Sequence, residues 1–272
     1  MNSAPESLRV FVEPELDGAT HMQRDRELLE SHLPGMPTCL RLYTWSPPAI
    51  SLGSMQDAAR LLDLEACQAA GIDVVQRPTG GRAILHWEEI TYAIVASADD
   101  ARFGGHVATS HAVIGRCLAA GLERLGVRAT LSRPALDPER RLLRQPCFAS
   151  PGRAELLVGG RKLLGSAQRR TASAFLQHGS LLLGPAHERL VDFLLDTERD
   201  PALAATMRDK LRRDTVTLGD LLGAAPSFET LVEVLVHGFA RTLELTVERA
   251  PIPRDARSGA GGVRPGRGLA ER

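Results

Sequence analysis

The chain has 272 residues, of which 43% are hydrophobic and 24% are charged, and its formal net charge is zero. This length and apolar content suit one globular domain with an ample core. Zero net charge provides no overall attraction to nucleic acid or to a membrane surface, and no apolar run reaches the roughly 18 residues that a membrane-spanning helix requires.

The cysteines are widely spaced along the chain. They are Cys39, Cys67, Cys117 and Cys147. Because no Cys-x-x-Cys pair occurs, their spacing argues against a zinc site and against a disulfide framework. The first six residues have neither the basic head nor the apolar core of a secretory signal. We therefore expect a cytoplasmic protein with free thiols and no metal site.

Strand and helix patterns alternate through the first third of the chain. Runs rich in β-branched and aromatic residues predict strands at residues 10–12, 38–45, 72–75 and 90–95. Two helices are predicted between them, at residues 20–31 and 63–70, the second ended by Gly71. Thr20 and Gln23 form a capping-box pattern, which predicts that the first helix starts at Thr20.

A polar, glycine-bearing segment at residues 77–86 lies between two of the predicted strands. Gly80 and Gly81 lack a Cβ atom, so their backbone amides can approach a ligand closely. Arg77 and Arg82 flank the glycines and can hold a phosphate, a carboxylate or a neighbouring carbonyl. Taken alone, so short a motif is more often an ordinary Gly-Gly turn with two solvated arginines.

The clearest helix is predicted at residues 110–125, where apolar residues recur on one face and Gly126 ends the pattern. Cys117 lies on that apolar face and is expected to pack in the core, as are Cys39 and Cys67 in their own predicted elements.

An irregular stretch follows at residues 132–151, and it carries Cys147. A structureless connection longer than about 12–15 residues is often a functional loop.

The last part of the chain predicts a hairpin, a strand and three helices. The hairpin joins residues 154–158 to 161–164 through Gly159-Gly160. The strand spans residues 174–183, and the helices span 186–195, 202–213 and 228–243, with Ser227 capping the last. We therefore expect an α+β fold with a central mixed, largely antiparallel sheet flanked by helices. Residues 1–249 form the catalytic domain of this prediction, and residues 250–272 a disordered tail rich in Gly, Pro and Arg.

Four blocks together resemble the biotin/lipoate protein ligase superfamily, and they occur in that family's order. The blocks are residues 45–56, 77–86 followed by 90–92, 146–148, and 160–169 followed by 176–183. The resemblance covers roughly residues 8–245 and implies the same sheet flanked by helices. Within the superfamily, the Gly-Gly-Arg-Ala sequence and the Cys-Phe pair are most similar to the LipM-type octanoyltransferases. The ATP-using lipoate ligases usually carry a third glycine where Arg82 stands.

The resemblance implies a substrate-binding site assembled from the Gly-Gly segment and the two strands after the hairpin turn. Its residues are Arg77, Thr79, Gly80, Gly81, Arg82, Ala83, His86, Gly165, Ser166, Ala167, Gln168 and His178. From the residues alone, His86 and His178 are equally well explained as hydrogen-bonded structural histidines.

Cys147 and Lys162 are the candidate catalytic residues. Arginines precede Cys147 closely, and Lys162 follows on the predicted hairpin. Nearby cations lower the pKa of a thiol from about 8.5 and so favour the nucleophilic thiolate. The resemblance places Lys162 at the reacting carbonyl, where its charge would also stabilise an oxyanion. The alternatives are an incidental loop cysteine and a solvated surface lysine.

The resemblance implies an octanoyltransferase that needs no ATP. Such an enzyme takes octanoyl from acyl carrier protein onto Cys147 and passes it to a lysine of glycine cleavage H protein or of a lipoyl domain. One alternative is an ATP-dependent lipoate-protein ligase, which would use ATP and Mg and leave Cys147 without a role. Another is a non-catalytic acyl-binding or carrier-binding protein on the same fold.

The charge pattern offers a way for such partners to dock. Residues 133–170 contain nine basic and three acidic residues, a net charge of +6. This segment is either a docking rim for acidic carrier proteins or a solvated basic face. We expect a monomer that binds no nucleic acid and no membrane.

Overall fold

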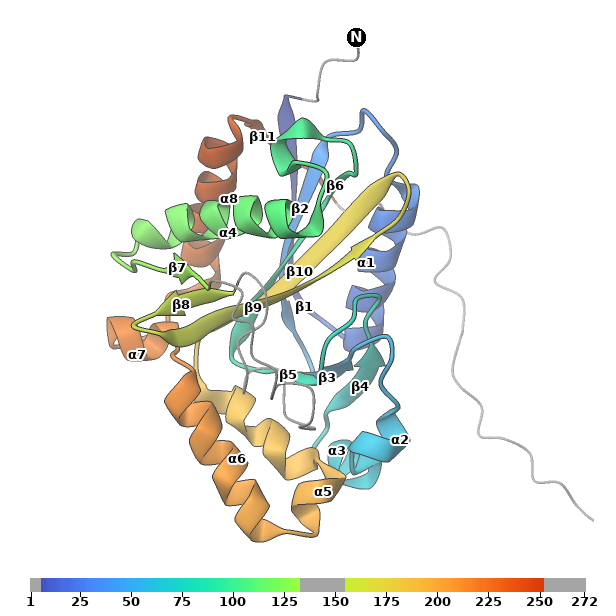
Figure 1. Ribbon diagram of the computed structural model, residues 1–272, viewed down its shortest axis with the longest axis vertical. Coiled ribbons are helices and arrows are strands. Elements are labelled where there is room, and N and C mark those ends of the chain that lie inside the picture. Colours follow the sequence, from blue (N-terminus) through green and yellow to red (C-terminus); the bar gives the residue numbers. More distant parts are fainter. Residues whose placement is uncertain (1–5, 133–154, 252–272) are drawn as a thin grey trace, which may run out of the picture.

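The computed structural model describes residues 6–132 and 155–251. The strands of its main sheet are β1 (Ser7–Leu16), β2 (Thr38–Trp45), β6 (Glu89–Ser97), β7 (Thr130–Leu131), β8 (Leu156–Val158), β9 (Arg161–Arg170), β10 (Ala174–Leu182) and β11 (Thr246–Arg249). A smaller sheet contains β3 (Ala49–Leu52), β4 (Asp73–Gln76) and β5 (Ile84–His86). Figure 1 shows the small sheet beyond one end of the main sheet, beneath α1.

The helices in the described part of the chain differ widely in length. The α-helices are α1 (Gly18–Ser31), α2 (Ala58–Leu61), α3 (Leu64–Ala69), α4 (Val107–Glu123), α5 (Leu195–Glu198), α6 (Pro201–Asp214), α7 (Leu218–Leu222) and α8 (Phe228–Leu243). Two 3₁₀ segments, η1 (Ala101–Phe103) and η4 (Pro185–Phe193), complete the set. None of the helices within residues 6–132 and 155–251 is long and apolar enough to cross a membrane.

The main sheet is mixed. Its strand order is β11-β1-β2-β6-β10-β9-β8-β7. β1 runs parallel to both β2 and β11, and the other neighbouring strands pair antiparallel. The predicted α+β fold with a mixed, largely antiparallel sheet is therefore confirmed. The sequence did not predict that β3, β4 and β5 separate into a second sheet.

Side chains along β2 alternate between the two faces of the main sheet, and the two faces have different surroundings. Leu40 and Leu42 join the largest apolar cluster, which includes α4 and α8. Cys39 and Tyr43 point the other way and cluster with Leu29 of α1. The first face is therefore the core of the domain, while the second is covered by α1 (Figure 1) and carries the polar site described below.

Several predicted boundaries needed correction. α1 begins at Gly18, and its N-cap is Asp17 rather than Thr20. The Asp17 carboxylate accepts from the Thr20 backbone N–H at 2.8 Å and satisfies a free donor of the first turn. The Gln23 side chain donates to Glu27, so the predicted capping box does not form. The helix predicted at 186–195 is the 3₁₀ segment η4.

The predictions that Gly159 and Gly160 form a tight turn and that Cys39 and Cys117 pack in the core are confirmed. Gly159 and Gly160 both have positive φ, 57° and 79°, as a tight hairpin turn requires. Burial raises the pKa of Cys39 to about 11 and that of Cys117 to about 12, which makes both unreactive packing thiols. Cys147 lies outside the described residues.

Candidate active site

Arg77 holds the Gly-Gly segment between β4 and β5 in shape from inside. Its side chain is buried, and the guanidinium donates to the backbone carbonyls of Ser51 at 2.8 Å, Gly80 at 3.0 Å and Arg82 at 2.7 Å. Of the three ligands predicted for this arginine, the structure shows the neighbouring carbonyl. A guanidinium with donors in a planar fork is suited to bracing a loop in this way.

The two glycines of this segment are not equivalent. Gly81 has φ of 103°, and a Cβ atom on it would lie 2.7 Å from Nη2 of Arg77. A Cβ atom on Gly80 would meet no atom within 4 Å, so a methyl group fits there. Only Gly81 of the pair lines the cavity described below. The prediction that a side chain is excluded therefore applies to Gly81.

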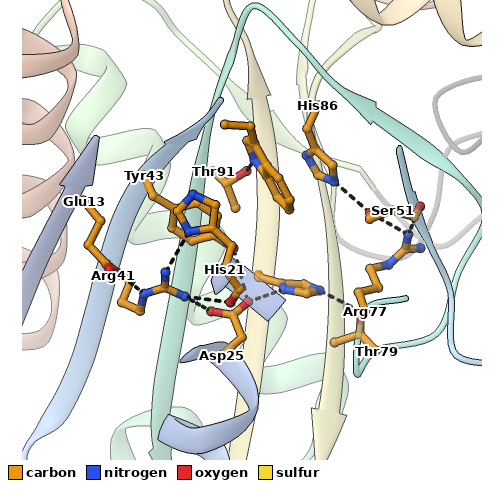
Figure 2. Close-up of polar contacts among 12 residues, drawn as sticks. Glu13, His21, Asp25, Arg41, Tyr43, Ser51, Arg77, Thr79, His86 and Thr91 are labelled. Carbon is orange, nitrogen blue, oxygen red and sulfur yellow. Dashed lines mark hydrogen bonds and ion pairs between the residues drawn. The ribbon is translucent and has the colours of Figure 1, made fainter. Parts of the chain in front are cut away.

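A chain of hydrogen bonds ties the segment to α1. Thr79 Oγ1 lies 2.7 Å from Nε2 of His178, and Nδ1 of His178 lies 2.8 Å from Oδ2 of Asp25. Burial acts to raise the pKa of Asp25, but the Arg41 charge and the bond to His178 hold it below its usual value. An ionised Asp25 can only accept, so Nδ1 of His178 donates to it. Figure 2 shows this chain crossing the site.

Arg41 is the centre of a second set of buried contacts on the same face. Its guanidinium donates to Glu13 at 2.6 Å and to Asp25, and it contacts Nδ1 of His21 at 3.0 Å (Figure 2). Burial, and then the Arg41 charge, lower the pKa of His21 to about 4. These residues were not predicted from the sequence. The available signal was Arg41 itself, a charged residue at an inward position of an otherwise apolar strand.

His86 and Trp45 form the opposite wall. The two rings stack with centroids 4.0 Å apart, and Nε2 of His86 lies 2.7 Å from Oγ of Ser51. Trp45 Nε1 donates to Thr91 Oγ1 at 2.9 Å. Burial lowers the pKa of His86, so the ring is neutral at neutral pH. His86 therefore lies at the site as predicted, held by stacking against Trp45 and by a hydrogen bond at Nε2.

Lys162 is buried rather than solvated. It lies at the start of β9, only 3% exposed, and its Nζ donates to Oε1 of Glu155 at 2.5 Å. Glu155 also lines the cavity, and its Oε2 has no hydrogen-bond partner among the described residues. The structure thus excludes the surface-lysine alternative and adds a carboxylate that the sequence did not single out.

The remaining predicted residues divide into those that line one narrow cavity and those that support it. Those lining it are Arg77, Gly81, His86, Gly165, Ser166, Ala167 and His178. Ser166 also bonds the Tyr92 hydroxyl at 2.7 Å, and Gln168 donates to Gln177 at 3.1 Å behind the strand. Ala83 packs in the core of the small sheet. Gln168, Ala83, Gly80 and Arg82 are absent from the lining within the described ranges.

The cavity is a narrow slot with mainly apolar walls and polar groups at fixed points, as ligand sites usually are. Further lining residues that the sequence did not predict include Met22, Tyr43, Trp45, Ile84, Thr91 and Ser180. Its free volume of about 60 Å³ would hold about two water molecules at roughly 30 Å³ each. Any ligand larger than this requires a side chain of the wall to move.

Comparison with known proteins identifies relatives of this arrangement. The family model described as lipoyl protein ligase A/B catalytic domain matches residues 17–240. The chain is 40% identical over 250 residues to octanoyltransferase LipM of Kyrpidia tusciae, with 89% of each chain covered. It is 34% identical over 247 residues to octanoyltransferase LipM of Brevibacillus brevis, with 88% of each covered.

A solved structure shares the fold. It is that of a bipartite lipoate protein ligase with its E2 lipoyl domain from Thermoplasma acidophilum, which is 21% identical with a TM-score of 0.73. The match covers 92% of this chain and 88% of the other.

Proposed function

Because the chain belongs to the lipoyl protein ligase A/B catalytic domain family, we propose that the site described above accepts an octanoyl group and transfers it to protein. The chain is an acyltransferase of protein lipoylation, as its octanoyltransferase relatives indicate. The proposed donor is octanoyl-acyl carrier protein, and the proposed acceptor is a lysine of glycine cleavage H protein or of a lipoyl domain.

The proposed reaction has two acyl-transfer steps through Cys147. The Cys147 thiolate attacks the octanoyl carbonyl, a new thioester bond forms, and the donor leaves as a thiol after taking up a proton. The uncharged amine of the acceptor lysine then attacks this thioester. An amide bond forms, the C–S bond breaks, and the amine proton goes to the departing Cys147 sulfur. Exchange of thioesters is near thermoneutral and amide formation is downhill, so we propose that neither ATP nor a metal is required.

Lys162 is the structural observation that carries this proposal. The chain has only two lysines among 33 basic residues, and one of them is buried beside the slot. A compact ammonium can donate to the oxyanion of a tetrahedral intermediate, and unlike a guanidinium it can also give up its proton. The ion pair with Glu155 holds this ammonium in place between turnovers.

Further parts of the proposal concern the cell and the partners. The reaction needs Cys147 as a free thiol, which a reducing cytoplasm maintains. An acidic donor would be drawn to the basic segment at 133–170. We propose that a single copy of the chain is sufficient for the reaction.

An ATP-free transfer assay tests the proposed function. The full-length protein is incubated with octanoyl-acyl carrier protein and a lipoyl domain, and the domain is weighed by mass spectrometry. A parallel reaction contains free octanoate with Mg-ATP in place of the loaded carrier. We expect octanoylation in the first reaction and its loss with Cys147→Ala. Modification only in the second reaction, unaffected by Cys147→Ala, would establish the ligase alternative instead.

A further inference from the structure

Met22 separates the slot from a second, open space. It lies on α1, is only 3% exposed, and lines both the slot and an outer groove of about 620 Å³. The groove is lined by Ala19, Met22, Gln23, Arg26, Ser54, Val75, Gln76, Arg77, Pro78 and Arg169. Among the described residues, Arg77 is the one other residue common to both linings. The end wall of the slot is therefore one side chain thick at Met22.

The slot has a reactive end and a tail end that the strand register defines. Glu155, which holds Lys162, directly precedes β8, and Leu156 pairs with Leu164 beside Gly165. Gly165 in turn pairs with Ser180 on β10. This end of the slot, next to Lys162, is where the acyl carbonyl reacts.

The other end lies two residues further along the same strand pair. There Ala167 pairs with His178, and His178 contacts Asp25 of α1, less than one helical turn from Met22. Two residues of strand span about 7 Å. An extended acyl chain whose carbonyl lies near Lys162 therefore points its methyl end toward α1.

We propose that Met22 is a specificity-determining residue that sets the longest acyl chain the slot accepts. The proposal rests on the acyl-transfer function proposed above. The other groups at this end are fixed, because His178 is bonded on both ring nitrogens and Arg77 directs its donors to the Gly-Gly segment and β3. Met22 has three rotatable side-chain bonds and an apolar side chain, so it is the wall that yields to a chain of the right length and stops a longer one.

The outer groove behind Met22 determines how shortening this side chain would affect the binding of longer acyl chains. Ala19, Val75 and Pro78 offer apolar surface in the outer groove, while Gln23, Arg26 and Arg169 form its polar rim. A chain passing the shortened residue would thus continue over apolar surface for several carbons before meeting water. Each buried methylene changes a binding constant by about fourfold. Two to four additional buried carbons should therefore strengthen binding of the acyl chain substantially.

Chain-length profiles of two opposite variants test this role. Acyl carrier protein loaded with hexanoyl, octanoyl, decanoyl or dodecanoyl is supplied with a lipoyl domain, and kcat/KM is measured for each donor. We expect Met22→Ala to raise the ratio of dodecanoyl to octanoyl transfer by at least about tenfold, at about fourfold for each added buried methylene. Met22→Phe should move the preference toward hexanoyl. Met36→Ala, a change at a partly exposed loop methionine, should keep the profile of the unaltered protein.

Each outcome distinguishes failure of this inference from failure of the proposed function. If the unaltered protein transfers octanoyl but both Met22 variants keep its profile, Met22 does not limit chain length. If Met22→Ala is inactive with every donor, the chain-length profile of Met22→Phe decides. An unchanged profile overturns the inference, and a profile shifted toward hexanoyl supports it. Absence of octanoyl transfer by the unaltered protein would overturn the proposed function itself.

Discussion

The site contains two buried charge clusters that resemble one another in chemistry and differ in their position: among the described residues Glu155 lines the slot, whereas Arg41, Glu13 and Asp25 do not. The Arg41 guanidinium contacts the carboxylates of Glu13 and Asp25 and the ring of His21. Around Lys162, Glu155 provides the carboxylate contact at 2.5 Å, and Oε2 of Glu155 has no hydrogen-bond partner in the described part of the chain.

This difference separates a scaffold from a working group. A buried charge that is held by several oppositely charged groups away from the slot resists rearrangement, because every alternative weakens those ion pairs. A buried lysine next to a substrate slot can exchange one partner for another during a reaction. We therefore interpret the Arg41 cluster as the support that fixes α1, His178 and the Gly-Gly segment. We propose that the Lys162–Glu155 pair is the part of the site that takes part in the reaction.

The largest expected effect comes from breaking the scaffold. Arg41→Met should lower the free energy of unfolding by about 3–5 kcal/mol, because it removes the arginine that neutralises the fully buried Asp25 carboxylate. Arg60→Met is the matched control, since Arg60 is 87% exposed in its own ion pair and should cost less than about 0.5 kcal/mol. Urea unfolding of both variants measures the difference. Equal, small losses would show that the Arg41 cluster is not a scaffold.

The second prediction separates the structural role of the Lys162 charge from its proposed role in the reaction. Lys162→Met should slow octanoyl transfer by about a hundredfold, the usual effect of losing an oxyanion donor. Adding Glu155→Gln removes the stranded carboxylate and should restore stability without restoring the rate. Lys210→Met, in a partly exposed pair with Asp214, serves as control. If the double variant regained full activity, Lys162 would have only a structural role.

Acid should weaken the scaffold through His21. The pKa of His21 is lowered from 6.5 to about 4 in the folded protein, so the unfolded chain takes up the proton first as the pH falls. Its contribution to stability is thus complete above pH 6.5 and is lost progressively toward pH 4, by about 2 kcal/mol between pH 7 and pH 5. Urea unfolding of His21→Gln should show a smaller loss over that interval. A loss of stability identical to that of the unaltered protein would mean that His21 does not titrate as described. His106→Gln is the control, because His106 is exposed.

The smallest effect distinguishes the two glycines of the loop that the scaffold holds. Gly81→Ala should cost about 1–2 kcal/mol because of its positive φ, and it should also impair transfer because the new methyl group meets Arg77 beside the slot. Gly80→Ala should be nearly neutral in stability. Thermal melting with transfer assays compares the pair, and equal behaviour would contradict the geometry described for Arg77.

The features that the sequence predicted correctly are those determined by neighbouring residues. The Gly159-Gly160 hairpin, the Ser227 cap and the alternating strands each depend on a few adjacent positions. The Gly-Gly segment and Lys162 were identified through the family's motifs, and both lie at or beside the slot.

The missed features depend on contacts between distant segments. Asp25 and His178 are 153 positions apart, and Arg41 meets residues from β1 and α1. No periodic pattern reports such pairings. β4 was predicted as a strand, but its pairing with β3 and β5 in a second sheet was missed, because the sequence pattern of such short strands does not report which strands pair.

The most direct test of the proposed mechanism is the mass of the enzyme itself after incubation with octanoyl-acyl carrier protein and no acceptor. We predict one added octanoyl group that hydroxylamine removes and that Cys147→Ser abolishes or leaves as a poorly reactive ester. A variant with Ala at positions 39, 67 and 117 should still form it, since all three of these thiols are buried. An unmodified enzyme, or an adduct that persists without the Cys147 thiol, would contradict transfer through this cysteine.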